Sequence, residues 1–109
     1  MKAFVIAAVV AASVAGAAQA AGSISDLQYL KAARCRGLAS SENLGKVDTA
    51  SLDALLRTET GTRDQPIQAS ASNRMASARK EADGAAGDKK AKLIAERDSE
   101  CAAFLSAAK

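Results

Sequence analysis

Two cysteines are the residues best suited to covalent chemistry in this sequence, and histidine is absent. Cys35 and Cys101 could form a disulfide, bind a metal ion or act as nucleophiles. A thiolate nucleophile is usually activated by an adjacent base, most often histidine, and two thiolates alone do not fill a tetrahedral zinc site. We therefore predict a Cys35–Cys101 disulfide and no metal site. An intermolecular bridge and free thiols are the alternatives.

Arg34 and Arg36 flank Cys35, and nearby positive charge favours a reactive thiolate. However, no C-x-x-C pair or histidine accompanies Cys35. A structural disulfide is therefore the preferred interpretation, and a redox role is the alternative.

Carboxylates are the remaining candidates for acid–base chemistry. They fall mostly on the polar faces or at the ends of the predicted helices, where solvation or helix capping explains them. The carboxylates concerned are Asp48, Asp53, Glu59, Asp64, Glu81, Asp83, Glu96, Asp98 and Glu100. Gly84 and Gly87 follow a predicted helix and lack the strand that precedes a phosphate-binding loop. We predict that the protein is not an enzyme and uses no cofactor.

Basic residues form two clusters that could bind an anionic partner, such as a lipid head group, a cell-wall polymer or an acidic protein. The clusters are Arg74, Arg79 and Lys80, and then Lys89, Lys90 and Lys92. An ordinary solvated face is the alternative interpretation. The sequence has no tryptophan and only three other aromatic residues, so it offers little surface for stacking on bases or sugars.

Residues 1–20 have the three parts of a secretory signal: Lys2, an uncharged alanine- and valine-rich run, and small residues before a predicted cleavage site after Ala20. An uncleaved membrane anchor is the alternative, and no later stretch is apolar enough to span a bilayer. The chain has 15 basic and 12 acidic residues. Loss of Lys2 leaves 14 − 12 = +2, so no nucleic-acid partner is expected. We predict a periplasmic or secreted protein.

The first and last helices must position the cysteines. Ser25 and Gln28 form a predicted capping box, and Gly37 is expected to end the helix that starts there. The apolar face of this first helix is predicted to contain Ile24, Leu27, Leu30, Arg34 and Leu38.

The last helix is predicted over 88–108, with Asp88 as its N-cap residue. Its buried stripe is predicted to comprise Ile94, Cys101, Leu105 and Ala108, with Leu93 and Phe104 beside it.

Two further helices are predicted between them. One begins near Asp48 and buries Leu52, Leu55 and Leu56. The other runs from Pro66 to Ala82, with Asp64 as a possible cap and a stripe of small residues. This stripe contains Ile67, Ala71, Met75, Ala78 and Ala82. Because alanine buries little area, we expect residues 57–87 to be mobile or weakly packed.

These elements predict an all-α fold, a small bundle or array of three to four helices closed by one disulfide. Residues 21–109 would form a single domain. Its role is predicted to be that of an interaction or structural module of the cell envelope, with a protein or anionic component as partner. The alternative is a stress-responsive periplasmic holdase, a chaperone that binds unfolding clients. The sequence does not indicate an oligomeric state.

Overall fold

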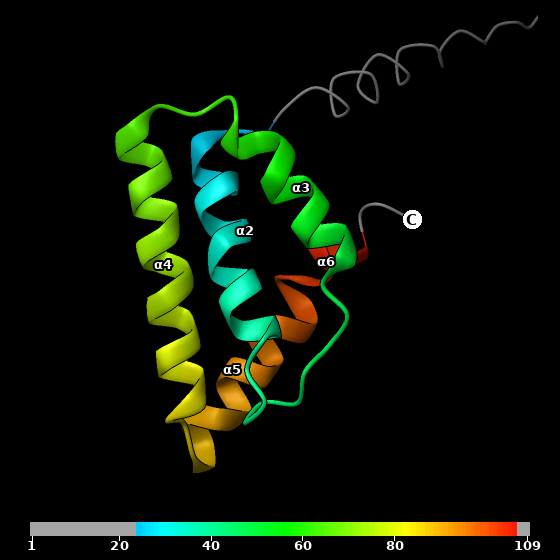
Figure 1. Cartoon of the computed structure of the whole chain (residues 1–109). Coiled ribbons are helices and arrows are strands. Elements are labelled where there is room, and N and C mark those ends of the chain that lie inside the picture. The colour runs from blue at the N-terminus through cyan, green and yellow to red at the C-terminus, as the bar shows by residue number, and fades with distance from the viewer. Residues whose placement is uncertain (1–23, 107–109) are drawn as a thin grey trace, which may run out of the picture.

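The computed structural model describes residues 24–106, so the predicted signal peptide and Ala108 lie outside the described residues. Within this range the chain forms helices and no strands (Figure 1), as predicted. The helices are α2 (Asp26–Ala39), α3 (Ala50–Thr60), α4 (Gln65–Asp83), α5 (Gly87–Ser99) and α6 (Ala102–Ser106). No helix among them is long and apolar enough to cross a bilayer. The sulfur atoms of Cys35 and Cys101 lie 2.01 Å apart, which confirms the predicted disulfide.

Helix α2 is the centre of the molecule. Figure 1 shows it between α3 and α4, with α5 behind it. Its buried positions occupy most of its circumference and are mainly small: Tyr29, Ala32, Ala33, Cys35, Leu38 and Ala39. The predicted apolar face was wrong at Leu27, which is 71% exposed. In a helix that packs against several neighbours, the buried positions need not carry the largest side chains. In α2 most of them are alanine or cysteine.

The predicted capping box starts α2. The Ser25 hydroxyl accepts a hydrogen bond from the Gln28 backbone at 3.1 Å, and the Gln28 side chain accepts one from the Ser25 backbone. The predicted end at Gly37 was wrong, because the helix continues to Ala39 and Gly37 is buried within it. A Cβ atom at Gly37 would lie 2.4 Å from the Met75 carbonyl oxygen. Gly37 therefore allows α2 and α4 to approach closely.

Helix α4 runs parallel to α2 along much of its length (Figure 1). Its predicted stripe faces the core: Ala71, Ala78 and Ala82 are buried, and Ile67 and Met75 are partly buried. Small side chains bury little area individually, but they let the two helix backbones come together. Asp64 occupies the N-cap position, although its side chain makes no capping hydrogen bond. The predicted mobility of residues 57–87 stays a prediction.

Helix α3 starts slightly later than predicted. Asp48 accepts a hydrogen bond from the backbone of Ala50, the first helical residue, at 3.0 Å. Leu52 and Leu56 are buried and Leu55 is partly buried, so the predicted face is confirmed. Helix α3 contacts α2 on one side and the C-terminal helix α6 on another.

The predicted last helix is divided in two. Helix α5 ends at Ser99, the chain turns at Glu100 and Cys101, and α6 then packs on α3 rather than continuing along α5. Asp88 is not the N-cap residue but lies in the first turn, after Gly87 with φ +55°. The turn keeps Cys101 within reach of Cys35 while it directs the remaining apolar residues toward α3.

The buried stripe of α5 also differs from the prediction. Its buried positions are Leu93 and Arg97, Ile94 is only partly buried, and the buried Cys101 follows in the turn after the helix. Arg97 donates from Nη1 to the backbone carbonyls of Leu44 at 2.9 Å and Gly45 at 2.7 Å. This arginine occupies a core position because it satisfies two carbonyl oxygens of the loop between α2 and α3.

Candidate functional site: a groove between α3 and α4

Arginines tie the central helix to its neighbours. Arg34 of α2 donates to both oxygens of Glu96 on α5, at 2.6 and 2.9 Å, and to Glu81 on α4 at 3.3 Å. The hydrogen bond to Glu96 raises the pKa of the Arg34 guanidinium, against the opposing effect of burial. Arg36, two residues on, donates to Asp53 of α3 at 2.5 Å. Together these ion pairs set the positions of α3, α4 and α5 around α2.

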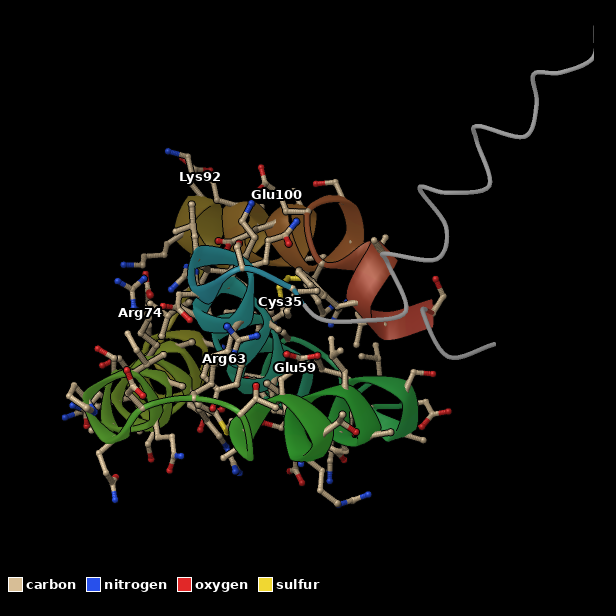
Figure 2. All side chains as sticks on the ribbon, turned by 90° about the horizontal axis from the view of Figure 1, so that it is seen from above. Cys35, Glu59, Arg63, Arg74, Lys92 and Glu100 are labelled. Carbon is tan, nitrogen blue, oxygen red and sulfur yellow. A yellow bond between two sulfur atoms is a disulfide. The ribbon has the colours of Figure 1, made fainter. Side chains whose placement is uncertain are left out.

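Another arginine, Arg63, forms a network of bonds at the end of the molecule where α2 begins. Arg63 bonds to Glu59 at 2.5 Å, to Asp26 at 2.7 Å and to the Ile24 carbonyl at 2.6 Å. Its guanidinium also lies 5.0 Å from the centre of the Tyr29 ring. Burial opposes the charge of Arg63, but its pKa is raised because the bonds to both carboxylates outweigh burial. Figure 2 shows Arg63 and Glu59 at this end, beside α2 and α3.

Between α3 and α4 the surface of α2 is incompletely covered, and a groove runs along it. We call this the α3–α4 groove and define it by three adjoining hollows. The first, of about 310 Å³, is lined by Tyr29, Ala33, Leu56, Gln68, Ala71 and Met75, among others. The second, of about 620 Å³, shares Ser72 and Met75 with the first. It adds Arg36, Ser40, Ala76, Arg79, Lys80 and Asp83.

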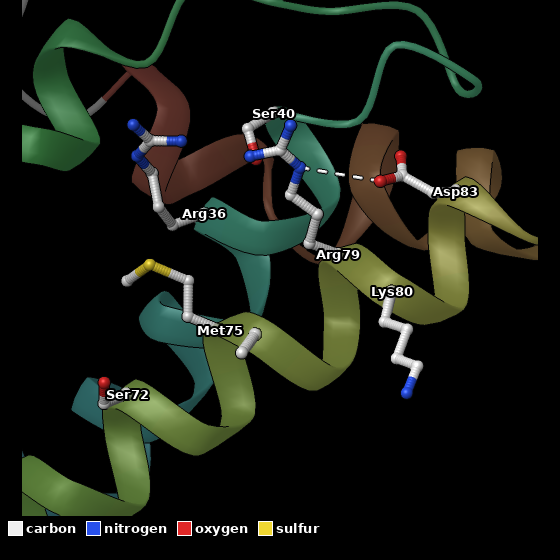
Figure 3. Close-up of a pocket in the computed structure, with 8 residues that line it drawn as sticks. Arg36, Ser40, Ser72, Met75, Arg79, Lys80 and Asp83 are labelled. Atoms are coloured by element: carbon white, nitrogen blue, oxygen red, sulfur yellow. Dashed lines mark ion pairs between the residues drawn. The ribbon is translucent and has the colours of Figure 1, made fainter.

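The third hollow, of about 260 Å³, lies where the groove meets the loop between α2 and α3. It is lined by Arg36, Ser40, Lys46, Val47, Thr49 and Arg79. Three cations from three segments therefore line one small space. Figure 3 shows Arg36 and Arg79 pointing to the same side of α4 as Met75 and Ser72, whereas Lys80 points away.

The carboxylates beside this end only partly balance its cations. Arg36 uses its Nε in its bond to Asp53, and no hydrogen bond of its Nη atoms is found among residues 24–106. Arg79 and Asp83 are 3.6 Å apart, and both side chains are about half exposed. The described residues provide no ion pair for the exposed Lys46. This end can therefore donate hydrogen bonds to an anion.

The structure does not gather the predicted basic residues into one surface. Arg79 and Lys80 line the second hollow of the α3–α4 groove, together with Asp83. Lys89 instead pairs with Glu81 at 3.1 Å, and it lines a separate hollow of about 550 Å³ with Lys92 and Arg34. Lys90 is partly exposed, and Arg74 and Lys80 are exposed. Binding of an anionic partner by these residues stays a prediction.

Sequence reasoning did not predict the ion-pair roles of Arg34, Arg36 and Glu59, and it assigned no role to Arg63 and Arg97. Glu59 and Arg63 are four apart, a spacing that favours a helical ion pair, and this was the available signal. Arg97 had no such signal, because its carbonyl partners lie more than fifty residues away in sequence. Lys46 was also missed, since a single lysine in a loop forms no pattern.

Among residues 24–106, no group of three or more metal-binding side chains is found. Comparisons with known protein families, curated sequences and solved structures give no significant match.

Proposed function

We propose that this protein is a small, noncatalytic interaction module of the cell envelope that binds its partner in the α3–α4 groove. The observation that carries the proposal is the groove itself. At one end Arg36, Lys46 and Arg79 line a polar hollow, and at the other the groove exposes apolar atoms around Met75. A concave surface with apolar walls and a few charged groups is typical of binding sites.

Export supports the same proposal. A leader at residues 1–20 would deliver the chain to an oxidising compartment, where a disulfide such as Cys35–Cys101 forms and persists. A domain this small has a limited core, so a covalent link between its central and C-terminal segments suits a protein that works outside the cytoplasm.

Site-specific photo-crosslinking tests the groove. A photoreactive amino acid would replace Ser72 within the groove or, as a matched control, the exposed Ala95 on α5. We expect an envelope component to crosslink from position 72 and not from position 95, with a lower yield when Arg79 is changed to Gln. Equal adducts from both positions, or none from either, would contradict the proposal.

Export is tested by the intact mass of the protein recovered from the envelope or medium. We expect a chain that begins at Ala21 and whose two cysteines are protected from alkylation. A full-length chain with two free thiols would remove the export premise.

An acid-activated holdase is a second candidate, and the interhelical ion pairs favour it. The ties from α2 to α3, α4 and α5 end on carboxylates: Asp53, Glu81 and Glu96. Loss of the charge on these carboxylates would weaken the ion pairs and expose the alanine-rich core, while the disulfide would limit the opening. Suppression of client aggregation should appear as the pH falls from neutral to acidic, and no suppression at any pH excludes this function.

A further inference from the structure

The two ends of the α3–α4 groove differ in chemistry. At the basic end, guanidinium groups from α2 and α4 and an ammonium group from the intervening loop line the 260 Å³ hollow. Arginine binds phosphate through paired N–H donors, and lysine adds a mobile positive charge. The hydroxyl groups of Ser40 and Thr49 lie in the same lining, but each already donates its proton, to the Gly37 carbonyl at 3.1 Å and to Asp53 at 3.0 Å. The donors that remain for a phosphate group are therefore those of Arg36, Lys46 and Arg79.

The far end offers apolar surface instead. The polar groups of Tyr29, Thr60 and Gln68 in its lining already have partners: the Tyr29 and Thr60 hydroxyls are 2.8 Å apart, and the Gln68 amide donates to the carbonyls of Thr60 and Arg63. The Ser72 hydroxyl lies where this hollow adjoins the second one. What remains for a ligand is carbon and sulfur surface from Ala33, Leu56, Ala71 and Met75, among others. A hydrocarbon chain gains from covering this surface, because it leaves no polar atom without a partner.

We propose that the α3–α4 groove binds a single-chain lipid with a phosphate head group, with its head at Arg36, Lys46 and Arg79 and its chain toward Tyr29. This inference rests on the proposed binding function and names the class of its ligand. The groove follows α4 from Gln68 to Arg79, about 17 Å at the helical rise, which gives room for an extended chain.

The apolar hollow between Tyr29 and Met75 has a volume of about 310 Å³. Its opening into the second hollow, at Ser72 and Met75, lets one chain pass from the basic end.

The protein carries its own reporter for this test. Tyr29 is the only tyrosine, tryptophan is absent, and Tyr29 lines the apolar hollow. Oxidised mature protein would be titrated with palmitoyl lysophosphatidate below its micelle concentration, while Tyr29 emission and heat are recorded. We expect saturable binding of one molecule per chain and a change in Tyr29 emission. Palmitoyl glycerol, which has the chain without the phosphate, and glycerol phosphate, which lacks the chain, should each bind at least about tenfold more weakly.

Variants locate the head group. Arg79→Gln and Lys46→Gln should each weaken binding about tenfold, because each removes a charged donor. Arg74→Gln, an exposed change on α4 outside the defined groove, should leave it unchanged. Circular dichroism and thermal unfolding would establish that all three variants fold. Ser72→Phe should block the passage and abolish the change in Tyr29 emission.

Three outcomes would overturn the inference: no saturable binding, equal binding of the lipid without phosphate, or equal weakening by Arg74→Gln. If palmitate binds as tightly as the lysophospholipid, the phosphate assignment is wrong. If position 72 crosslinks to a protein while lysophosphatidate does not bind, the interaction module stands and the lipid assignment falls. If both experiments fail, the proposed function falls with the inference.

Discussion

Gly37 and Arg97 illustrate two kinds of residue whose roles depend on distant segments. Gly37 looked like a helix end, because glycine often terminates helices and turn-forming residues follow it. Its actual role depends on Met75, Ala78 and Arg79, whose atoms leave no room for a Cβ. The capping box at Ser25 was predictable because both of its hydrogen bonds are local. Local sequence signals were thus sufficient to predict where α2 begins but not where it ends.

Gly37→Ala should destabilise the protein. The new methyl group would lie 2.4 Å from the Met75 carbonyl oxygen and 2.9 Å from the Ala78 Cβ, so α2 and α4 would have to separate. We expect a loss of about 1–3 kcal/mol in the free energy of unfolding, the usual cost of overpacking. Urea denaturation measures it. Gly61→Ala is the matched control, because its nearest neighbour is 3.7 Å away. An equal effect at both glycines would refute the close-packing explanation.

Arg97→Met should destabilise the loop between α2 and α3. The substitution keeps much of the side-chain volume but removes both donors, which leaves the buried Leu44 carbonyl without its bond. We expect a cost of roughly 1–3 kcal/mol in urea denaturation. Hydrogen exchange should become faster in residues 40–49. Arg57→Met, at an exposed position of α3, should change neither measurement.

Among the helices, periodicity predicted the helical segments but neither the separate helix α6 nor the way the helices pack. The leucines of α3 and the alanine stripe of α4 indicated the buried faces correctly. Helix α2 packs against several neighbours, and the prediction placed Leu27 on its buried face although this residue is exposed. The division between α5 and α6 has no sequence signal such as proline. It reflects the separate packing of Cys101 on α2 and of α6 on α3. Similarly, the groove requires the splay of α3 from α4, which periodicity does not encode.

Reduction of the disulfide should loosen α5 and α6 from the rest of the fold. The Cys35–Cys101 bond spans 66 residues, and loop-closure entropy gives it about 4 kcal/mol. Thermal unfolding with and without reductant would show a lower melting temperature in the reduced protein. A Cys35→Ala/Cys101→Ala double variant should be insensitive to reductant. If reductant shifts both proteins equally, its effect does not arise from the bond.

The whole molecule combines a core rich in alanine with ion pairs between arginines and carboxylates of different helices. Because the apolar core is small, these ion pairs account for a larger part of the contacts between helices. This combination also predicts how stability depends on pH. Because histidine is absent, the free energy of unfolding should change little between about pH 6 and 8.

Below that range the protein should lose stability. The hydrogen bond from Lys89, aided by Arg34, holds the pKa of Glu81 below its ordinary value despite burial. A depressed pKa gives stability that is present above the unfolded value, about 4.3, and is lost as the pH falls through the folded value. We expect urea midpoints to fall between about pH 5 and 3.

Glu81→Gln should reduce that pH dependence, because glutamine cannot be protonated in this range. Glu42→Gln, at an exposed loop position, is the matched control and should leave the dependence intact. A Glu81→Gln variant with the same pH dependence as the native protein would show that Glu81 makes no contribution.

The parallel arrangement of α2 and α4 has a consequence for the order of events in folding. Gly37 meets Met75 and Arg79 some forty residues later in the chain, and Cys35 meets Cys101 later still. Helix α2 is therefore synthesised well before α4 and α5, which cover much of its buried surface. Such distant contacts slow folding relative to bundles whose neighbouring helices pair in sequence. A nascent chain that ends before α4 would carry the central helix of the fold with α3 as its only helical neighbour among those described.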